Sequence, residues 1–344
     1  MRRLALVLAA LVPGAALAAQ TPAPSPALTP KATEQPAKDQ AGKPPMRELP
    51  SPYTPNYTGG ALPRGGGQPD FAYGAYQKGQ YVTAFREATK RIEADRRDAA
   101  AMTLLGELYN QGLGVRQDPV KAAEWYRLAA ALNDSAAMSS LGLMSMDGRG
   151  VQKDLKAGRR WLESAAEKGS PTAAYNLALI LIGAAKPEDE ARAATLLRKA
   201  AENEIGPAQH GLGVLYLQGR GVPKDPSQAA EWFRRAADNG DLAGEVEFAI
   251  LLFNGNGVPK DEARAARYFL HAAQRGNAIA QNRVARLYAV GRGLQKNLLE
   301  AATWNLLAAQ QGLSDAWLDQ TLSGLTTDEK RRAEAQASAR NEAR

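Results

Sequence analysis

Residues 101–130, AMTLLGELYNQGLGVRQDPVKAAEWYRLAA, contain the pattern on which most of the chain is built. Gly106 recurs as Gly or Ala, Trp125 as a large residue and Ala129-Ala130 as an alanine pair, at intervals of 35 or 36 residues. These three features keep the same spacing from one another in six successive copies, which identifies an internal repeat. The six units begin near Ala99, Ser135, Pro171, Gly206, Leu242 and Ala278.

Each unit is expected to form two helices joined by a short loop. In the first half of a unit, apolar residues recur at spacings of three and four, which is typical of a helix. Two glycines then end this helix, because glycine adopts a positive φ without steric cost. Four residues after the second glycine, an Asp or Asn is placed to cap the second helix. These caps are Asp118, Asp154, Asp225, Asp261 and Asn297, and Asn297 with Glu300 forms a predicted capping box.

One such hairpin cannot bury its own apolar face, so adjacent hairpins are expected to stack in series. The sequence therefore predicts an all-α fold, an α-solenoid of six helical hairpins over residues 99–313. We expect the tryptophans of the second helices to be buried between hairpins. They are Trp125, Trp161, Trp232 and Trp304.

The repeated pattern resembles the SEL-like repeat, a helical-hairpin relative of the tetratricopeptide repeat. The third unit departs from it, because Gly183 has no partner glycine and Leu196 replaces tryptophan. The resemblance implies a right-handed α-solenoid with helical caps, here a TPR-like hairpin at 70–98 and a C-terminal cap at 314–344. In the first unit it is carried by Ala101, Leu105, Gly106, Tyr109, Gly112, Gly114, Val115, Asp118, Ala122, Trp125, Tyr126, Ala129 and Ala130.

The amino-terminal part of the chain is expected to lie outside the repeats. Residues 1–19 have a positively charged start, an apolar run and Ala-Leu-Ala at 16–18, the pattern of a secretory signal peptide. The apolar run is shorter than the roughly 20 residues that span a bilayer, and the chain has no cysteine to carry a lipid. Residues 20–69 hold 12 of the 20 prolines, so we predict a disordered linker there. These features predict a periplasmic or secreted protein.

Composition argues against several kinds of site. The chain has no cysteine, which excludes thiolate metal sites and thiol nucleophiles, and only two histidines, His210 and His271. Residues 70–324 carry 31 basic and 29 acidic residues, so no broad positive surface is available for nucleic acid. The three Gly-Arg-Gly segments lack the lysine of a phosphate-binding loop and are expected to end helices. We predict no catalytic residue, no cofactor and no metal, and therefore a protein that is not an enzyme.

Related repeats place their first helices on the concave wall of the solenoid, and this chain is expected to do the same. In each first helix, one apolar residue directly precedes Gly106 or its equivalent. The wall positions are the second residue before and the second residue after that apolar residue. In the middle units these positions are apolar and suited to an amphipathic helix or an extended peptide, unless several of them pack between hairpins. The predicted groove residues are Leu143, Tyr175, Leu179, His210, Val214, Val246 and Ile250.

Two functions are compatible with this groove. One is an exported interaction scaffold or regulator that binds a protein or peptide partner in the cell envelope. The resemblance implies this range, since exported members of the family include regulators of envelope signalling and adaptors for envelope assembly. The alternative is a binding module for cell-wall fragments or a surface polysaccharide. A groove poor in aromatic residues favours peptide over sugar, and the oligomeric state stays open.

Overall fold

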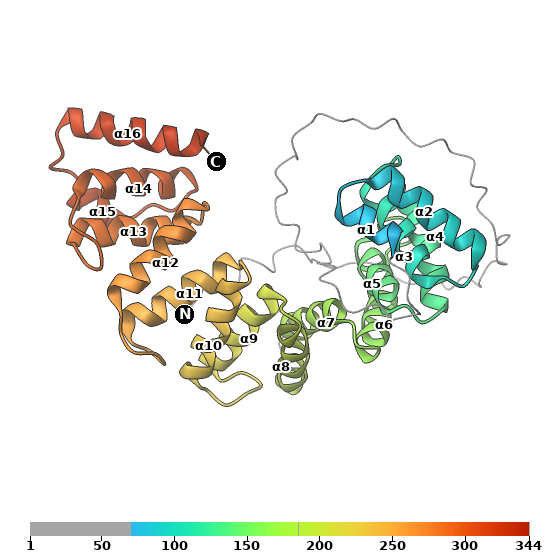
Figure 1. Ribbon diagram of the computed structural model, residues 1–344. Helices are drawn as coiled ribbons and strands as arrows, with labels where there is room; N and C mark the ends of the chain where they lie inside the picture. Colours follow the sequence, from blue (N-terminus) through green and yellow to red (C-terminus); the bar gives the residue numbers. More distant parts are fainter. Residues whose placement is uncertain (1–69, 185, 344) are drawn as a thin grey trace. The chain divides into compact units, whose positions relative to one another are not determined.

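The computed structural model describes residues 70–184 and 186–343, and every regular element in them is an α-helix (Figure 1). The predicted signal peptide at 1–19 and linker at 20–69 lie outside the described residues. The helices are α1 (Phe71–Gln77), α2 (Tyr81–Ala94), α3 (Ala99–Gln111), α4 (Pro119–Ala131), α5 (Ser135–Asp147), α6 (Leu155–Glu167), α7 (Pro171–Ala184), α8 (Pro187–Glu202), α9 (Gly206–Gln218), α10 (Pro226–Asp238), α11 (Leu242–Asn254), α12 (Glu262–Gln274), α13 (Ala278–Val290), α14 (Leu298–Gln310), α15 (Ala316–Thr321) and α16 (Thr327–Glu342).

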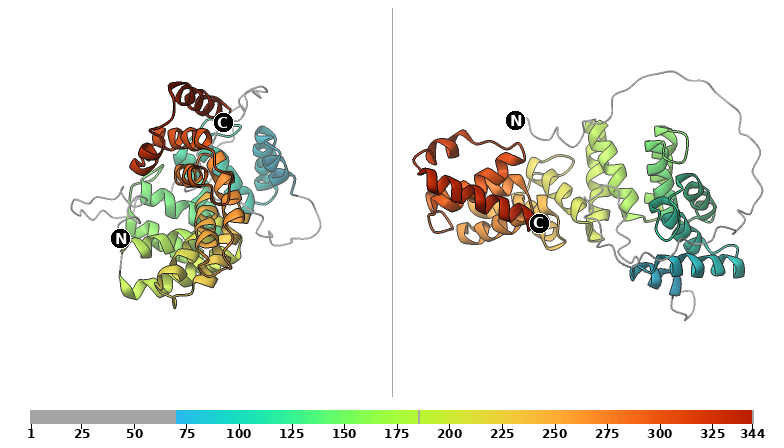
Figure 2. Two further views of the ribbon diagram at one scale, coloured as in Figure 1. Left: turned by 90° about the vertical axis from the view of Figure 1, so that its left-hand side faces the viewer. Right: turned by 90° about the horizontal axis from the view of Figure 1, so that it is seen from above.

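Helices α3 to α14 form six hairpins, each with an odd-numbered first helix and an even-numbered second helix. The predicted all-α solenoid is therefore confirmed, and so is the number of hairpins. The described residues divide into two compact units, 70–158 and 159–343, with the boundary inside α6. Within the second unit, consecutive helices from α7 to α14 pack against one another in series, and α16 packs along α14 (Figures 1 and 2).

The two helices of a hairpin come close where a first-helix glycine faces a ring of the second helix. A Cβ atom added to Gly106 would lie closer than 3.0 Å to the Tyr126 ring, and one added to Gly213 equally close to the Phe233 ring. Both rings are completely buried. A glycine inside a helix costs about 1 kcal/mol relative to alanine, and burying a whole aromatic ring offsets that cost.

The tryptophan column is only partly buried, which corrects the prediction for two of its members. Trp232 and Trp304 are 7% and 3% exposed, whereas Trp125 and Trp161 are half-buried. The residue after the tryptophan, such as Phe233, points into the hairpin and takes the most buried position. The tryptophan ring lies beside that residue, so the burial of the tryptophan depends on which side chains cover it. Over Trp232, the Arg235 guanidinium lies 4.6 Å from the centroid of the ring.

The predicted caps of the second helices are confirmed, while the predicted capping box is wrong. The capping side chains are Asp118, Asp154, Asp225, Asp261 and Asn297. The carboxylate of Glu300 does not return to the backbone of Asn297, because it accepts hydrogen bonds from Trp304 Nε1 (3.1 Å) and Arg340 Nη2 (2.8 Å). A complete capping box is formed instead by Thr326 and Glu329 at the start of α16.

The second glycine of a loop joins one hairpin to the hairpin before it. Gly257 has a φ of +75°, and a Cβ atom there would lie closer than 3.0 Å to the carbonyl group of Pro226, in the first turn of α10. Gly221 has a φ of +66°, and a Cβ atom there would also lie closer than 3.0 Å to a carbonyl group, that of Glu190 in α8. Each loop therefore rests directly on backbone, with no room for a side chain.

Arginines in two of these loops strengthen the same junctions. Arg220 Nε donates to Glu190 Oε1 at 2.8 Å, and Arg292 Nη2 donates to Glu262 Oε1 at 2.6 Å. The Gly-Arg-Gly segments at 219–221 and 291–293 therefore hold neighbouring hairpins together. The expectation that they end helices is also met, because Gly219 and Gly291 are left-handed C-caps.

Replacing Trp232 by alanine is expected to lower the free energy of unfolding by about 3–5 kcal/mol, because a large buried ring is removed. Urea unfolding followed by circular dichroism measures the change. The matched control is Trp317→Ala, whose side chain is 42% exposed and whose loss is expected to cost about 1 kcal/mol or less. Equal stability of Trp232→Ala and the parent would contradict the proposed packing.

The loop junction predicts a difference between two glycine substitutions with almost the same backbone angle. Gly240 has a φ of +78° with no atom within 4 Å of an added Cβ, so Gly240→Ala is expected to cost about 1–2 kcal/mol from φ alone. Gly257→Ala is expected to cost about 1–3 kcal/mol more, because its Cβ would also displace the backbone of the preceding hairpin. The same urea titration compares them, and equal losses would refute the junction.

Candidate partner-binding face

Six of the seven predicted groove residues lie in the unit formed by 159–343, on the first helices α7, α9 and α11. Leu143 lies on α5, in the other unit. We call the side formed by the first helices of the 159–343 unit the first-helix face. Within it α9 contacts α11, and α13 contacts α15.

Exposure differs strongly among the predicted residues. Leu179 is 41% exposed, which makes it one of the few large hydrophobic side chains of the described residues that are open to solvent. The half-buried residues are Tyr175, His210, Val214 and Ile250. The face therefore presents apolar side chains on three successive first helices.

Two predicted groove residues are buried, which corrects their assignment as partner contacts. Leu143 is 9% exposed and Val246 is 4% exposed. The helices around them explain this, because α5 packs against α3 and α4, and α11 packs against α9, α10 and α12. Both side chains contribute to the core and leave a partner little surface. The prediction anticipated this alternative for several of the wall positions.

The centre of the face carries polar groups between α9 and α13. The His210 ring lies 5.6 Å from the Phe233 ring, measured between centroids. Burial raises the pKa of Glu247 on α11, while His210 and Arg283 on the flanking helices act in the opposite direction. Sequence reasoning missed Glu247, although a carboxylate inside the apolar stretch of α11 was a visible signal.

A cavity of about 320 Å³ lies at the α13 end of the face. Ile250 is the only one of the seven predicted groove residues that lines it, and Arg286 holds a polar wall position that the predicted groove did not include. The others were missed because the prediction considered two positions per helix and did not extend to α15, where Trp317 was the available signal. The cavity is lined by Ile250, Phe253, Asn254, Phe269, Arg283, Arg286, Leu287, Val290, Arg292 and Trp317.

Arg286 connects α13 to the start of α15. Its Nε and Nη2 atoms donate to the two oxygens of Asp315 at 2.6 and 2.8 Å, and Asn282 Nδ2 donates to the same carboxylate at 2.7 Å. Burial raises the pKa of Asp315, but these hydrogen bonds outweigh burial and lower it to about 2. Asn282 and Arg286, which lie two residues before and two after Val284 at the wall positions of α13, therefore fix the start of α15 in place.

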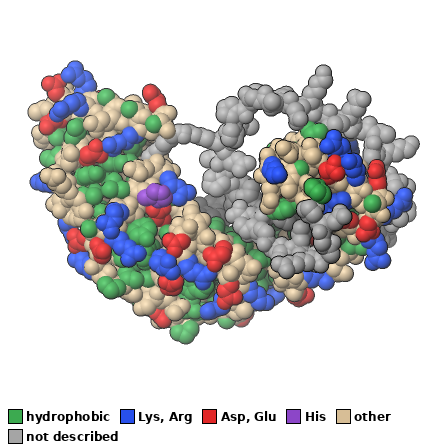
Figure 3. Space-filling model, in the orientation of Figure 1, with side chains coloured by type: hydrophobic (Ala, Val, Ile, Leu, Met, Phe, Trp, Pro, Cys, Tyr) green, Lys and Arg blue, Asp and Glu red, His purple; other side chains and the backbone are tan. Residues whose placement is uncertain are grey.

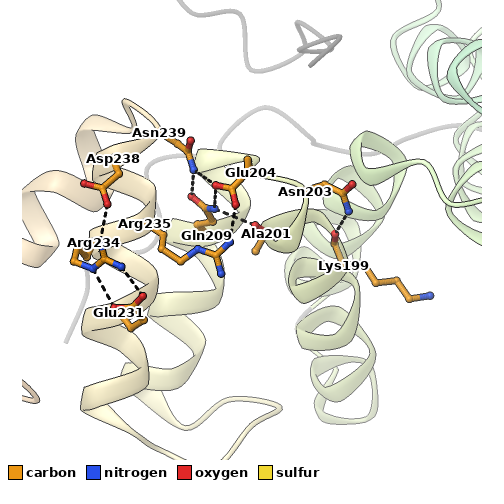
Figure 4. Close-up of polar contacts among 10 residues, drawn as sticks. All are labelled: Lys199, Ala201, Asn203, Glu204, Gln209, Glu231, Arg234, Arg235, Asp238 and Asn239. Carbon is orange, nitrogen blue, oxygen red and sulfur yellow. Dashed lines mark hydrogen bonds and ion pairs between the residues drawn. The ribbon is translucent and has the colours of Figure 1, made fainter. Parts of the chain in front are cut away.

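A polar cluster joins α8, α9 and α10 at the ends of the hairpins (Figure 4). Glu204 has a φ of +60°, and its carboxylate accepts hydrogen bonds from Arg235 Nη2 (2.7 Å), Asn239 Nδ2 (2.6 Å) and Gln209 Nε2 (3.1 Å). The bonds from Asn239, Arg235 and Gln209 lower the pKa of Glu204. Buried Gln209 also donates to the carbonyl oxygen of Ala201, at 3.0 Å. The partners of this cluster lie within the chain, so it is a structural junction.

The second histidine of the chain joins two helices. His271 Nδ1 lies 2.6 Å from Oε1 of the buried Glu245, which joins α12 to α11. Over residues 70–184 and 186–343, no group of three His, Asp or Glu side chains is placed to hold a metal ion. No helix in those ranges is long and apolar enough to cross a membrane.

The comparison with protein families agrees with this geometry. The Sel1 repeat model matches residues 99–134, 135–170, 171–204, 206–241, 245–277 and 278–313, together more than half of the chain. The chain belongs to the Sel1 repeat family. Sel1 repeats are TPR-like scaffolds typical of protein–protein interaction modules, and proteins of this family are generally not catalytic.

Solved structures show the same architecture. A Sel1 repeat protein from Oxalobacter formigenes is 27% identical, with a TM-score of 0.60, over 71% of this chain and 97% of that one. The c5321 protein, a protective antigen of uropathogenic Escherichia coli with an SLR fold, is also 27% identical, with a TM-score of 0.50 over 79% of this chain and 67% of that one. A search of the curated proteins gives no match.

Proposed function

We propose that this Sel1 repeat protein is an exported interaction scaffold that binds a segment of a protein partner on its first-helix face and catalyses no reaction. The observation that carries the proposal is the solvent-exposed Leu179 on α7, followed by half-buried Val214 on α9 and Ile250 on α11. A partner that covers these side chains removes apolar area from water at about 25 cal/mol per Å². Neighbouring polar groups such as Glu247 then select its register.

A peptide fits this face better than a polysaccharide does. Among its solvent-accessible residues, Leu179, Val214 and Ile250 are aliphatic. Aliphatic side chains suit the apolar face of an amphipathic helix or the alternate side chains of an extended strand. We therefore place a cell-wall fragment or surface polysaccharide second, and nucleic acid outside the proposed partners.

Substitution of Leu179 or Val214 by Glu is expected to abolish capture of the partner, because the new carboxylate would be desolvated without a counter-charge. The tagged chain is used to recover partners from cell-envelope extract, with quantitative mass spectrometry as the readout. The control is Val120→Glu on α4, a 55% exposed apolar residue on a second helix of the other unit. Circular dichroism verifies that all three variants fold.

A partner that is recovered by wild type and Val120→Glu but not by either face variant supports the proposal. If Leu179→Glu and Val214→Glu both fold and both still capture the partner, the proposal is wrong. The contact would then belong to another surface of the chain.

Export supplies a separate test. The charged start, the apolar run and the Ala-Leu-Ala at 16–18 predict cleavage near residue 19, so the mature protein is expected in the periplasmic fraction without its first residues. Amino-terminal sequencing identifies the cleavage point. The matched variant Leu8→Arg interrupts the apolar run and is expected to keep the precursor intact in the cytoplasm. Uncleaved wild-type protein in the cytoplasm would refute export.

A further inference from the structure

We propose that the cavity between α11, α13 and α15 binds a peptide segment in which an Asp or Glu stands next to a bulky apolar side chain. The inference rests on the proposed function and names the chemistry of the partner. It depends on three observations: the apolar floor of the cavity, an arginine at its wall that forms no ion pair with any described residue, and exposed apolar side chains around its mouth.

The floor of the cavity suits an apolar side chain. Ile250 and Phe253 of α11, Phe269 of α12 and Leu287 of α13 line it. The volume of about 320 Å³ accommodates one or two bulky side chains and is too small for a folded element. Filling it with an aromatic or branched side chain replaces water against apolar walls.

Three guanidinium groups line the same cavity, but two of them are already paired. Arg286 donates two hydrogen bonds to Asp315, and Arg292 donates two to Glu262. Arg283 is exposed and forms no hydrogen bond or ion pair with any residue that the structure describes. The charge of Glu247 acts on it only from beyond ion-pair distance. Arg283 therefore has its five N–H donors available to a ligand.

Exposed apolar side chains surround Arg283. Ile279 and Val290 are 53% and 47% exposed, and they lie four residues before and seven residues after Arg283, which places all three on one side of α13. Trp317 of α15, 42% exposed, lines the same cavity. In the space-filling view, hydrophobic side chains form patches over the C-terminal helices, with Lys and Arg side chains beside them (Figure 3).

Charge complementarity selects an acidic peptide as the occupant. A purely apolar segment that covered this surface would desolvate Arg283 without pairing it, which is costly. A carboxylate beside the apolar anchor comes within hydrogen-bond distance, which Glu247 does not, and the planar guanidinium binds it with two parallel hydrogen bonds. The apolar anchor and the acid then recognise the cavity together, and neither is sufficient alone.

The test uses the full chain labelled with 5-fluorotryptophan, in which the Trp317 resonance is assigned through Trp317→Phe. The probes are two dipeptides of nearly equal shape, acetyl-Phe-Asp-amide and acetyl-Phe-Asn-amide, which differ in charge. We expect the Asp dipeptide to shift the Trp317 resonance saturably, with a dissociation constant of roughly a millimolar, because a small flexible ligand loses translational and conformational freedom for few contacts. The Asn dipeptide is expected to bind at least fivefold more weakly.

Two arginine variants separate a specific contact from general electrostatics. Arg283→Gln is expected to abolish the preference for the Asp dipeptide, while residual apolar binding is kept. Arg267→Gln, an exposed arginine of α12 outside the cavity, is expected to keep the preference. Val290→Glu is expected to weaken both dipeptides, since it replaces an apolar side chain of the cavity lining by a hydrated carboxylate.

Three results would overturn the inference: equal affinity for the two dipeptides, a preference that survives Arg283→Gln, or no shift of Trp317 up to the solubility limit. Dipeptide binding that occurs only after deletion of residues 20–69 would also overturn it, because the occupant of the cavity would then be the chain's own 20–69 segment. Because Trp317 is read directly, failure here is distinct from failure of partner capture, which the Leu179 and Val214 variants test on α7 and α9.

Discussion

Where a hairpin loop has a second glycine, the stacking of that hairpin on the one before depends on a backbone contact at this glycine, which cannot be replaced without strain. At Gly257 the chain has a positive φ, and the Cα lies so close to the first turn of α10 that a Cβ atom would displace it. Both demands, on backbone angle and on space, exclude every residue with a side chain. The spacing of hairpins in the solenoid is thereby set by backbone, while the side chains around the contact vary from one hairpin to the next.

The residues that repeat most strictly are used by the fold and leave little for recognition. Gly213 accommodates the Phe233 ring inside its hairpin, and the alanine pairs allow second helices to approach their neighbours. The side chains that we propose as partner contacts are those that differ between hairpins, such as Leu179 and Arg283. A repeat pattern therefore reveals the architecture of this protein clearly, and its binding chemistry must be sought in departures from the pattern.

The same distinction explains how far the sequence could be interpreted. Periodicity fixes where helices begin and end, so the six hairpins and their capping residues were predictable. Periodicity does not fix how far each helix is rotated about its own axis. It therefore does not determine which side chains turn toward the neighbouring hairpin. For this reason Val246 was placed on the binding face although it is buried, and Trp125 was expected in the core although it is half-buried. The partners of Glu300 were equally hidden, because Arg340 belongs to the terminal helix α16.

Ion pairs between hairpins give the unpaired Arg283 its significance. In the 159–343 unit, several arginines bind a carboxylate about 30 residues away in sequence, on a neighbouring hairpin or, for Arg286, at the start of the terminal helix α15. Ion pairs that water can reach contribute little to stability, so the main effect of such pairs here is to orient neighbouring hairpins. Arg283 lies among these pairs, on the same helix as Arg286, yet forms no ion pair with any residue of 70–184 or 186–343. A guanidinium left out of such a series is available to a carboxylate that another molecule supplies. The pairs are Arg220–Glu190, Arg235–Glu204, Arg286–Asp315 and Arg292–Glu262.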